Sequence, residues 1–198
     1  MGIWFDFVSW ALDQYQKVLI RLRAFSFFLI RGTRLKKIGR GCKIKGGNRI
    51  AFGKGICIGD YCWIEAIYKY QGKVYKPKLD IGDNVAISDL SHISCADQIS
   101  IGKDCLIGSK VYIGDHNHGT TKNYNELITT PPALRHLGDM AQIVIGEKCW
   151  ICDGAVILAG TNLAPGSIVG ANSVVHLIEK RPALIAGMPA KVIRYFDL

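Results

Sequence analysis

Three of the five histidines of this chain fall in one irregular stretch, residues 111–146, and two of them stand in Asp115-His-Asn-His118. Imidazole is the side chain best suited to accept a proton near neutral pH, and a neighbouring carboxylate can fix its tautomer. Residues 115–118 therefore suit a general base, with Asp115 orienting one of the two imidazoles. Two other interpretations stay open: exposed turn histidines, or two imidazoles that share a metal ion.

The metal interpretation is the less favoured one. Residues i and i+2 of an extended segment face the same side, so His116 and His118 could reach one ion. A catalytic zinc site needs a third protein ligand, and neither His92 nor His136 stands in an obvious partner motif. The sequence therefore predicts no metal.

The residues on either side of this stretch follow a period of six. A strand alternates with period two and a helix with period 3.6, so neither accounts for this spacing. A polygonal coil does, because each hexad supplies one short strand and one tight turn, with its aliphatic anchor inside. The residue after the anchor is most often glycine, which we expect to ease the turn. The anchors are Ile38, Ile44, Ile50, Ile58, Ile64, Ile81, Ile87, Ile93, Ile101, Ile107, Ile113, Ile145, Ile151, Ile157, Leu163 and Val169.

This period predicts an all-β fold, a parallel β-helix over residues 38–198, with a long loop over 117–142 extruded from it. Residues 1–37 form a separate segment. Apolar and aromatic residues recur there at intervals of three and four over 3–30, which predicts a helix or a helix pair. The longest uncharged run after Arg23 covers 24–30 and is too short to cross a bilayer.

Charge is concentrated after this apolar segment. The formal net charge is +9, and residues 31–49 carry eight basic side chains and no acid. Aromatic residues followed by basic ones are typical of a helix in the interface of an anionic membrane. A helix that caps the open end of the coil is the other interpretation. Seven scattered cysteines and no recognisable secretory leader predict reduced thiols in a cytoplasmic protein.

Four segments carry a resemblance to a known family: residues 109–119, 145–151, 169–175 and 186–191. They resemble the left-handed β-helix acyltransferases with hexapeptide repeats, and more closely the bacterial surface-polysaccharide O-acetyltransferases of the WbbJ type. The resemblance covers essentially residues 38–196. It implies a left-handed coil, a homotrimer with active sites between neighbouring subunits, and acetyl-CoA as the acyl donor.

The resemblance also implies roles for individual residues. The family's base is a histidine five residues beyond a hexad anchor, which from Ile113 is His118, with His116 as its neighbour. The residues expected to contact acetyl-CoA are Trp150, Ala171, Ser173, Lys191 and Arg194. Ser88 and Asp89 match positions that bind the acceptor. In the family a Thr-Lys pair often follows the position of Val174-Val175, and His176-Leu177 replaces it here. The lysine's contact with the cofactor is therefore either missing or supplied by Lys180 or Arg181.

Together these features predict an acetyl-CoA-dependent O-acetyltransferase. Its expected acceptor is a sugar hydroxyl of a bacterial surface polysaccharide or its precursor, such as O-antigen, capsule or exopolysaccharide. The alternatives are an N-acyltransferase on an amino sugar, a metal-binding hydratase and a non-catalytic scaffold. Expected partners are a carbohydrate and, through residues 1–49, an anionic membrane, but no nucleic acid. We expect the protein in the cytoplasm, peripheral on the inner face of the cytoplasmic membrane.

Overall fold

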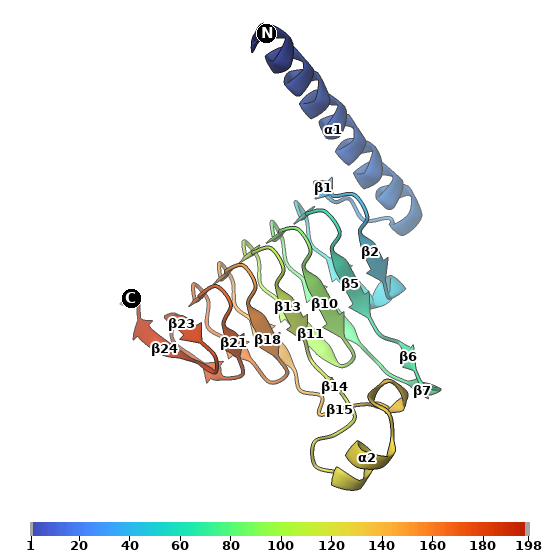
Figure 1. The fold of residues 1–198 in the computed structure, drawn as a ribbon, viewed down its shortest axis with the longest axis vertical. Coiled ribbons are helices and arrows are strands. Elements are labelled where there is room, and N and C mark those ends of the chain that lie inside the picture. The colour runs from blue at the N-terminus through green and yellow to red at the C-terminus, as the bar shows by residue number, and fades with distance from the viewer. Residues whose placement is uncertain (1, 197–198) are drawn as a thin grey trace.

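A computed structural model describes residues 2–196, and it confirms the predicted parallel β-helix (Figure 1). The short strands stack into three sheets, and each coil of the chain contributes one strand to each sheet in turn. The first sheet contains β1 (Lys37–Ile38), β4 (Cys57–Ile58), β9 (Ala86–Ile87), β12 (Leu106–Ile107), β17 (Trp150–Ile151), β20 (Ile168–Val169), β23 (Ala183–Gly187) and β24 (Ala190–Tyr195).

The other two sheets have six strands each. The second contains β2 (Lys43–Lys45), β5 (Trp63–Ala66), β10 (His92–Cys95), β13 (Tyr112–Gly114), β18 (Val156–Leu158) and β21 (Val174–Val175). The third contains β3 (Ile50–Phe52), β8 (Lys78–Ile81), β11 (Gln98–Ile101), β16 (Ile143–Ile145), β19 (Asn162–Leu163) and β22 (Ile178–Glu179). Pairing within the three sheets is parallel except between β23 and β24.

The hexad anchors form the core of the coil. Every anchor of the predicted series except Ile44 is buried. Parallel pairing puts Ile93 opposite Ile64 on one side and Ile113 on the other, so anchors stack from coil to coil. Full burial of such a side chain contributes about 1.5–3 kcal/mol, which makes this column the main source of stability.

The glycine after the anchor has a different role from the expected one. At Gly102, which does not adopt a positive φ, an added Cβ would lie 2.6 Å from the backbone nitrogen of Glu147 in the next coil. The left-handed turn lies two residues further on, at Asn84, Asp104 and Lys148, with φ of 57°, 60° and 57°. Glycine is therefore needed for the close approach of coils, and other residues make the turn.

Two excursions leave the corner between the second and third sheets. The first is a hairpin of β6 (Lys69–Tyr70) and β7 (Lys73–Val74), in the stretch where the hexads become irregular. The second is the predicted loop, which contains β14 (Asn117–His118), α2 (Tyr124–Thr129), the 3-10 helix Pro132–Leu134 and β15 (Leu137–Gly138). A further 3-10 turn, Gly47–Arg49, lies in the first coil.

The N-terminal segment is one helix, α1 (Gly2–Arg31), which projects from the coil (Figure 1). Only its C-terminal part packs on the coil: Ala24 is buried, and Phe27 meets Phe52 edge-on with ring centroids 5.9 Å apart. The Arg23 Nε donates a hydrogen bond of 3.1 Å to the Ile38 carbonyl. No helix in the described part of the chain combines the length and the apolar character needed to cross a membrane.

Candidate active site

A cleft of about 560 Å³ lies on the outer face of the second sheet, beside the corner from which both excursions leave. Each excursion supplies part of its wall, and the sheet supplies the floor. The polar and aromatic residues that face it include His116, His118, Tyr70, Trp63, Glu65, His92, Ser94 and Tyr112. The cleft therefore gathers both histidines of the tetrapeptide and residues from three successive coils.

Asp115 holds His116 in a defined orientation. The Asp115 side chain is fully buried and accepts hydrogen bonds from the backbone N–H groups of Ala96, at 2.8 Å, and Asp97, at 2.9 Å. Its Oδ1 also lies 2.9 Å from Nδ1 of His116. A carboxylate at this position favours the imidazole tautomer that carries its proton on Nδ1. The second ring nitrogen, Nε2, is then left as a proton acceptor on a side chain that lines the cleft.

His118 has different surroundings. It is exposed and lies on β14, opposite Leu137 of β15. Its ring meets Tyr70 edge-on, with centroids 5.3 Å apart. The hydrogen-bonded partner of Asp115 is thus His116, which settles the choice of imidazole that the sequence left open.

The two excursions form one wall although they are far apart in the sequence. The Tyr70 hydroxyl and the Gln71 side-chain amide both donate to the Ala133 carbonyl, at 2.8 and 2.7 Å. The Tyr75 hydroxyl accepts a hydrogen bond of 2.9 Å from the backbone N–H of Leu137. Tyr75 and Leu137 are buried in a small apolar cluster of their own. These contacts place the hairpin beside the histidine loop.

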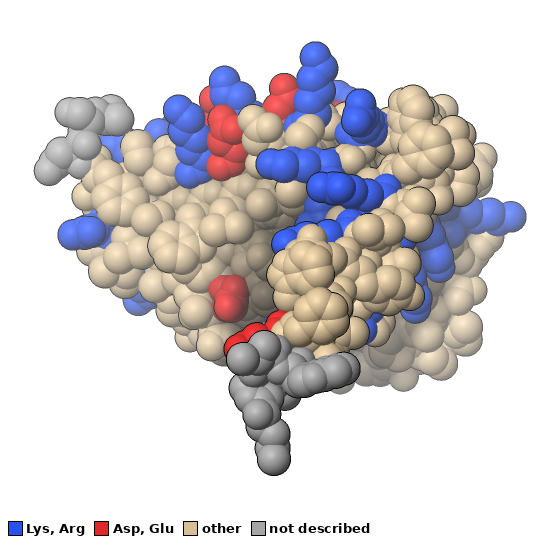
Figure 2. All heavy atoms as spheres, turned by 90° about the horizontal axis from the view of Figure 1, so that it is seen from above, with Lys and Arg blue, Asp and Glu red and all other residues tan. Residues whose placement is uncertain are grey.

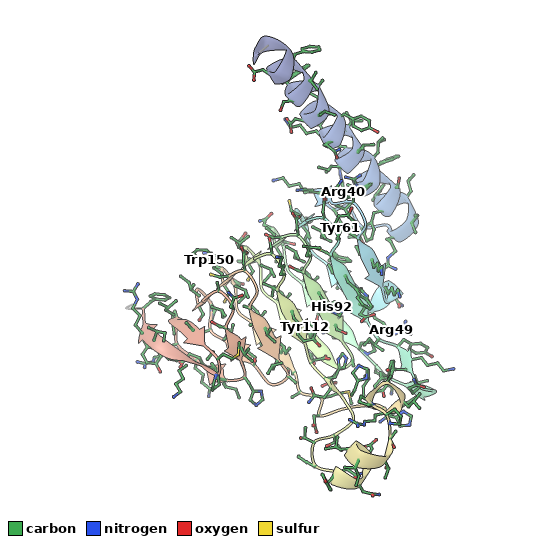
Figure 3. All side chains as sticks on the ribbon, in the orientation of Figure 1. Arg40, Arg49, Tyr61, His92, Tyr112 and Trp150 are labelled. Carbon is green, nitrogen blue, oxygen red and sulfur yellow. The ribbon has the colours of Figure 1, made fainter. Side chains whose placement is uncertain are left out.

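An aromatic ladder forms the floor of the cleft. Trp63, His92 and Tyr112 occupy equivalent positions in three successive coils. Trp63 stacks on His92 with centroids 4.5 Å apart and planes 13° apart, and Tyr112 meets His92 edge-on at 5.4 Å. Figure 3 labels His92 and Tyr112 on this face of the coil.

Glu65 is the carboxylate of this floor. Its Oε1 accepts a hydrogen bond of 3.1 Å from the Ser94 hydroxyl and lies 3.5 Å from Nε2 of His92. Burial opposes ionisation of Glu65, but the contacts with His92 and Ser94 and the charge of Lys45 outweigh it. The pKa of Glu65 therefore lies below its ordinary value, and the group is an anion at neutral pH.

Two buried nitrogens in the cleft lack a hydrogen-bond partner among the described residues. They are Nε1 of Trp63 and Nε2 of His92. The 3.5 Å contact between His92 and Glu65 has the distance of an ion pair but not the alignment of a hydrogen bond. Buried polar groups are seldom left unpaired, because the desolvation cost is of order 1–3 kcal/mol. Both nitrogens have almost no exposed surface, so neither presents a donor or acceptor to a ligand in the cleft.

The residues expected to contact the donor lie elsewhere on the chain. Trp150 is exposed on the first sheet, away from His92 and Tyr112 (Figure 3). Ala171 is exposed at a turn, and Lys191 and Arg194 are exposed on β24. None of these side chains lines the cleft of this single chain.

Ser173 departs from the expectation that it lines a cofactor channel. Its side chain is fully buried, and its Oγ accepts a hydrogen bond of 3.1 Å from the backbone N–H of Gly187. The hydroxyl therefore supports the turn before β24 and has no surface for a ligand.

Ser88 and Asp89 also lie outside the cleft. Asp89 Oδ1 accepts a hydrogen bond of 2.7 Å from the backbone N–H of Asp60 in the preceding coil. This contact ties neighbouring coils together at a corner, which is a structural role.

The sequence held a signal for the floor residues that a search for reactive side chains alone would miss. On the second sheet the residue before the anchor is aromatic in three successive coils, at Trp63, His92 and Tyr112. The residue after the anchor is Glu65 or Ser94 in place of the usual glycine. Glycine is also absent after anchors of the first sheet, at Ser88 and Cys152, so the aromatic run is the more specific of the two signals.

No group of three or more His, Cys, Asp or Glu side chains within residues 2–196 is placed to hold a metal ion. The cleft offers one ordered imidazole–carboxylate pair and a second carboxylate. This arrangement can accept a proton and bind hydroxyl groups.

No family model matches the sequence, but individual proteins do. The chain is 35% identical over 158 residues to WbbJ of Escherichia coli K12, named as a lipopolysaccharide biosynthesis O-acetyltransferase, and the match covers 79% of this chain and 76% of that protein. It is 28% identical over 178 residues to WcaF of the same organism, named as a colanic acid biosynthesis acetyltransferase, covering 90% and 77%.

A solved structure has the same fold. It is a variant of AntD, an N-acyltransferase from Bacillus cereus, in complex with a dTDP-amino sugar and coenzyme A. The TM-score is 0.61 at 16% identity, with 81% of this chain and 84% of that chain covered. On the identity and coverage of the match to WbbJ, the chain belongs to the hexapeptide-repeat acetyltransferases, the family that includes that protein.

Proposed function

We propose that this protein transfers the acetyl group of acetyl-CoA to a sugar hydroxyl of a bacterial surface polysaccharide or its precursor. The observation that carries the proposal is the Asp115–His116 pair at 2.9 Å on the wall of the cleft. The activity for which WbbJ is named and the coenzyme A bound to AntD support the same donor chemistry.

His116 is the general base in this proposal, and not His118, the position that the family resemblance implies. Nε2 of His116 accepts the proton of the sugar hydroxyl while its oxygen attacks the thioester carbonyl carbon. The carbon–sulfur bond then breaks, and the same proton passes from the imidazolium to the departing sulfur. Buried Asp115 stabilises the imidazolium and keeps the ring in place throughout.

The aromatic ladder and Glu65 form the acceptor site in this proposal. An ionised carboxylate accepts hydrogen bonds from sugar hydroxyls. Glu65 lies in the same cleft as His116, so one bound sugar can contact both.

We further propose that the active unit is a homotrimer. Trp150, Lys191 and Arg194 lie outside the cleft, so one copy does not present the expected donor residues to its own His116. A neighbouring copy could bring its first sheet and β24 to the cleft. The proposed location is the inner face of the cytoplasmic membrane, where precursors of surface glycans carry a lipid.

The test measures coenzyme A release from acetyl-CoA in the presence of candidate glycan acceptors. We expect His116→Ala to lower kcat by about 10²–10⁴-fold, the usual contribution of a general base. His118→Ala keeps the Asp115–His116 pair and is expected to cost far less. A large loss with His118→Ala and a small one with His116→Ala would overturn the assignment of the base.

The chemistry of the product is tested separately. Hydroxylamine cleaves an acetyl ester and leaves an acetamide intact, so treatment of the labelled product distinguishes transfer to oxygen from transfer to nitrogen. A product that resists hydroxylamine would replace the proposal with N-acylation of an amino sugar.

A further inference from the structure

A second cavity lies between α1 and the first coils. Its volume is about 900 Å³. Its walls come from the C-terminal half of α1, the connection over 34–36 and the turn at 54–55. Apolar side chains in the walls are Ala24, Phe25, Phe28 and Leu35, and cationic ones are Arg21, Arg34, Lys36 and Lys54. The catalytic cleft shares none of these residues.

The four cations have no anionic partner among the described residues. No carboxylate lies within the 4.0 Å limit of an ion pair from any of them, and no acidic residue lines the cavity. The nearby arginines differ, because Arg23 and Arg31 donate to the backbone carbonyls of Ile38 and Gly47. Four like charges around one hollow repel one another unless an anion lies between them. Figure 2 shows Lys and Arg side chains gathered beside the helix.

The helix continues this cavity as an exposed apolar face. Residues at intervals of three and four lie on one side of a helix. On α1 these are Leu12, Tyr15, Val18, Leu22, Phe25 and Leu29, and each is exposed. Phe25 belongs both to this face and to the cavity, so the apolar face and the cationic cavity are continuous.

We propose that this cavity binds the phosphate headgroup of an anionic phospholipid while the apolar face of α1 lies in the membrane interface. Arg and Lys are the residues that bind phosphate oxygens. An amphipathic helix with aromatic and aliphatic residues on one face and basic residues beside it is suited to the boundary between headgroups and acyl chains. A phospholipid offers both chemistries together, an anion for the hollow and hydrocarbon for Phe25 and Phe28.

A second copy of the chain is a poorer occupant. The helix offers only two carboxylates, Asp6 and Asp13, and Asp13 already pairs with Lys17 at 2.6 Å. Two helices packed face to face would therefore leave the cations of the hollow uncompensated. The inference deepens the membrane location within the proposed function and does not depend on acetyl transfer.

The experiment is co-sedimentation of the full chain with vesicles, without acetyl-CoA or acceptor. Vesicles of phosphatidylcholine alone are compared with vesicles that also contain phosphatidylglycerol. The test variant is Arg34→Gln with Lys54→Gln. The control is Lys110→Gln with Lys148→Gln, which removes the same charge from exposed sites on other coils. Circular dichroism checks that both variants fold.

We expect binding to the anionic vesicles only. The contribution of a basic residue near such a surface corresponds to roughly fivefold in affinity, so the test variant should lose about 25-fold and the control much less. Equal losses in the two variants would overturn the proposal in favour of a general charge effect. Equal binding to both vesicle types would overturn the role of the phosphate charge.

Two other results would identify a different occupant and also overturn the proposal. Inorganic phosphate that raises the melting temperature of the wild type but not of the test variant, without vesicle binding, would indicate a site for free phosphate. Concentration-dependent association that Leu22→Asp abolishes, again without vesicle binding, would indicate a second copy on the helix. Acetyl transfer to a soluble acceptor is unaffected in every case, so failure here is distinguishable from failure of the proposed reaction.

Discussion

The Asp115 carboxylate links the architecture of the coil to its chemistry. Two backbone N–H groups of the neighbouring corner, at Ala96 and Asp97, donate to its two oxygens, and His116 shares one of them. The coil thus fixes the carboxylate, and the carboxylate fixes the imidazole. The proposed base therefore does not depend on the exposed loop for its orientation.

Asp115→Asn tests this link at the scale of one residue. An amide has one acceptor oxygen where the carboxylate has two, so its NH₂ group faces a backbone N–H in either orientation, and in one of them it also faces the imidazole. We expect kcat to fall by at least about 10²-fold, because the imidazolium loses its stabilising charge. We also expect the free energy of unfolding to fall by about 1–3 kcal/mol.

The measurements are steady-state kinetics and urea unfolding at one protein concentration. Asp97→Asn is the matched control, since that side chain is exposed and changes no contact of His116. Unchanged kcat in Asp115→Asn would show that the carboxylate has no part in proton transfer.

The Asp139 carboxylate makes the stability of the loop depend on pH. Its carboxylate accepts hydrogen bonds from the Thr120 hydroxyl at 2.7 Å and from the backbone N–H of Thr121 at 2.8 Å, and these contacts lower its pKa to about 2. Because the folded pKa is depressed, the stabilisation is complete above the ordinary Asp pKa of about 3.9. It is lost as the pH falls toward 2.

We therefore expect Asp139→Asn to lower the melting temperature at neutral pH, and this difference from wild type to shrink between about pH 4 and pH 2. Thermal unfolding followed by circular dichroism over that range measures it. A difference that stays constant down to the lowest pH would mean that the hydrogen bonds at Thr120 and Thr121 do not depend on the charge.

At the scale of elements, the glycines after the anchors set the spacing of the coils. Gly102→Ala places a methyl group 2.6 Å from the Glu147 backbone nitrogen, a contact that side-chain movement cannot relieve. For Gly170→Ala the nearest atom is the Ala186 Cβ, at 3.0 Å, and the backbone oxygen of Ile185 lies at an ordinary contact distance of 3.7 Å. We expect Gly102→Ala to destabilise by about 1–3 kcal/mol or more, and Gly170→Ala by clearly less. Urea unfolding of the two variants compares them, and equal losses would contradict the steric explanation.

The elements also show how far the sequence predicts this fold. The period of six identified the coil and, except for Ile44, its buried anchors, because burial repeats wherever the strand does. The repeat could not predict the contact between the hairpin and the loop. Tyr70 and Ala133 meet through irregular segments, which have no period that could pair them. The sequence also does not reveal which residue of each turn is left-handed. Tyr61 and Leu90, each three residues after an anchor, adopt a positive φ although neither residue type favours it.

The candidate site could be predicted only in part, because its geometry depends on contacts between distant segments. The tetrapeptide drew attention to both histidines, but the choice between them depends on a carboxylate whose direction only the corner at Ala96 determines. The residues expected at the donor site had been placed by resemblance alone. Ser173 shows why resemblance alone is insufficient, because a residue can match a family position while its side chain is buried.

At the scale of the whole molecule, the proposed trimer makes a prediction about mixed assemblies. If each site takes His116 from one copy and Lys191 and Arg194 from its neighbour, co-expression of His116→Ala with Lys191→Ala/Arg194→Ala restores activity. With random assembly a site has its base in one half of cases and its donor residues in one half, which gives about one quarter of wild-type activity.

The measurement is acetyl transfer by the purified mixture, compared with each variant alone and with the two variants mixed after separate folding. No recovery in co-expressed material that does contain both chains would mean that each copy holds a complete site. A trimer would then no longer be needed to complete the site.

The attachment of α1 has a consequence for self-assembly. A stack of parallel strands ends in unpaired backbone groups, and another copy can pair with them. At one end the C-terminal part of α1 packs against the first coil, and at the other β24 turns back antiparallel on β23. The two elements cap the ends of the β-helix and block strand pairing with another copy. Removal of α1 alone is therefore expected to let two copies associate through their exposed first coils, because β24 still blocks growth at the other end.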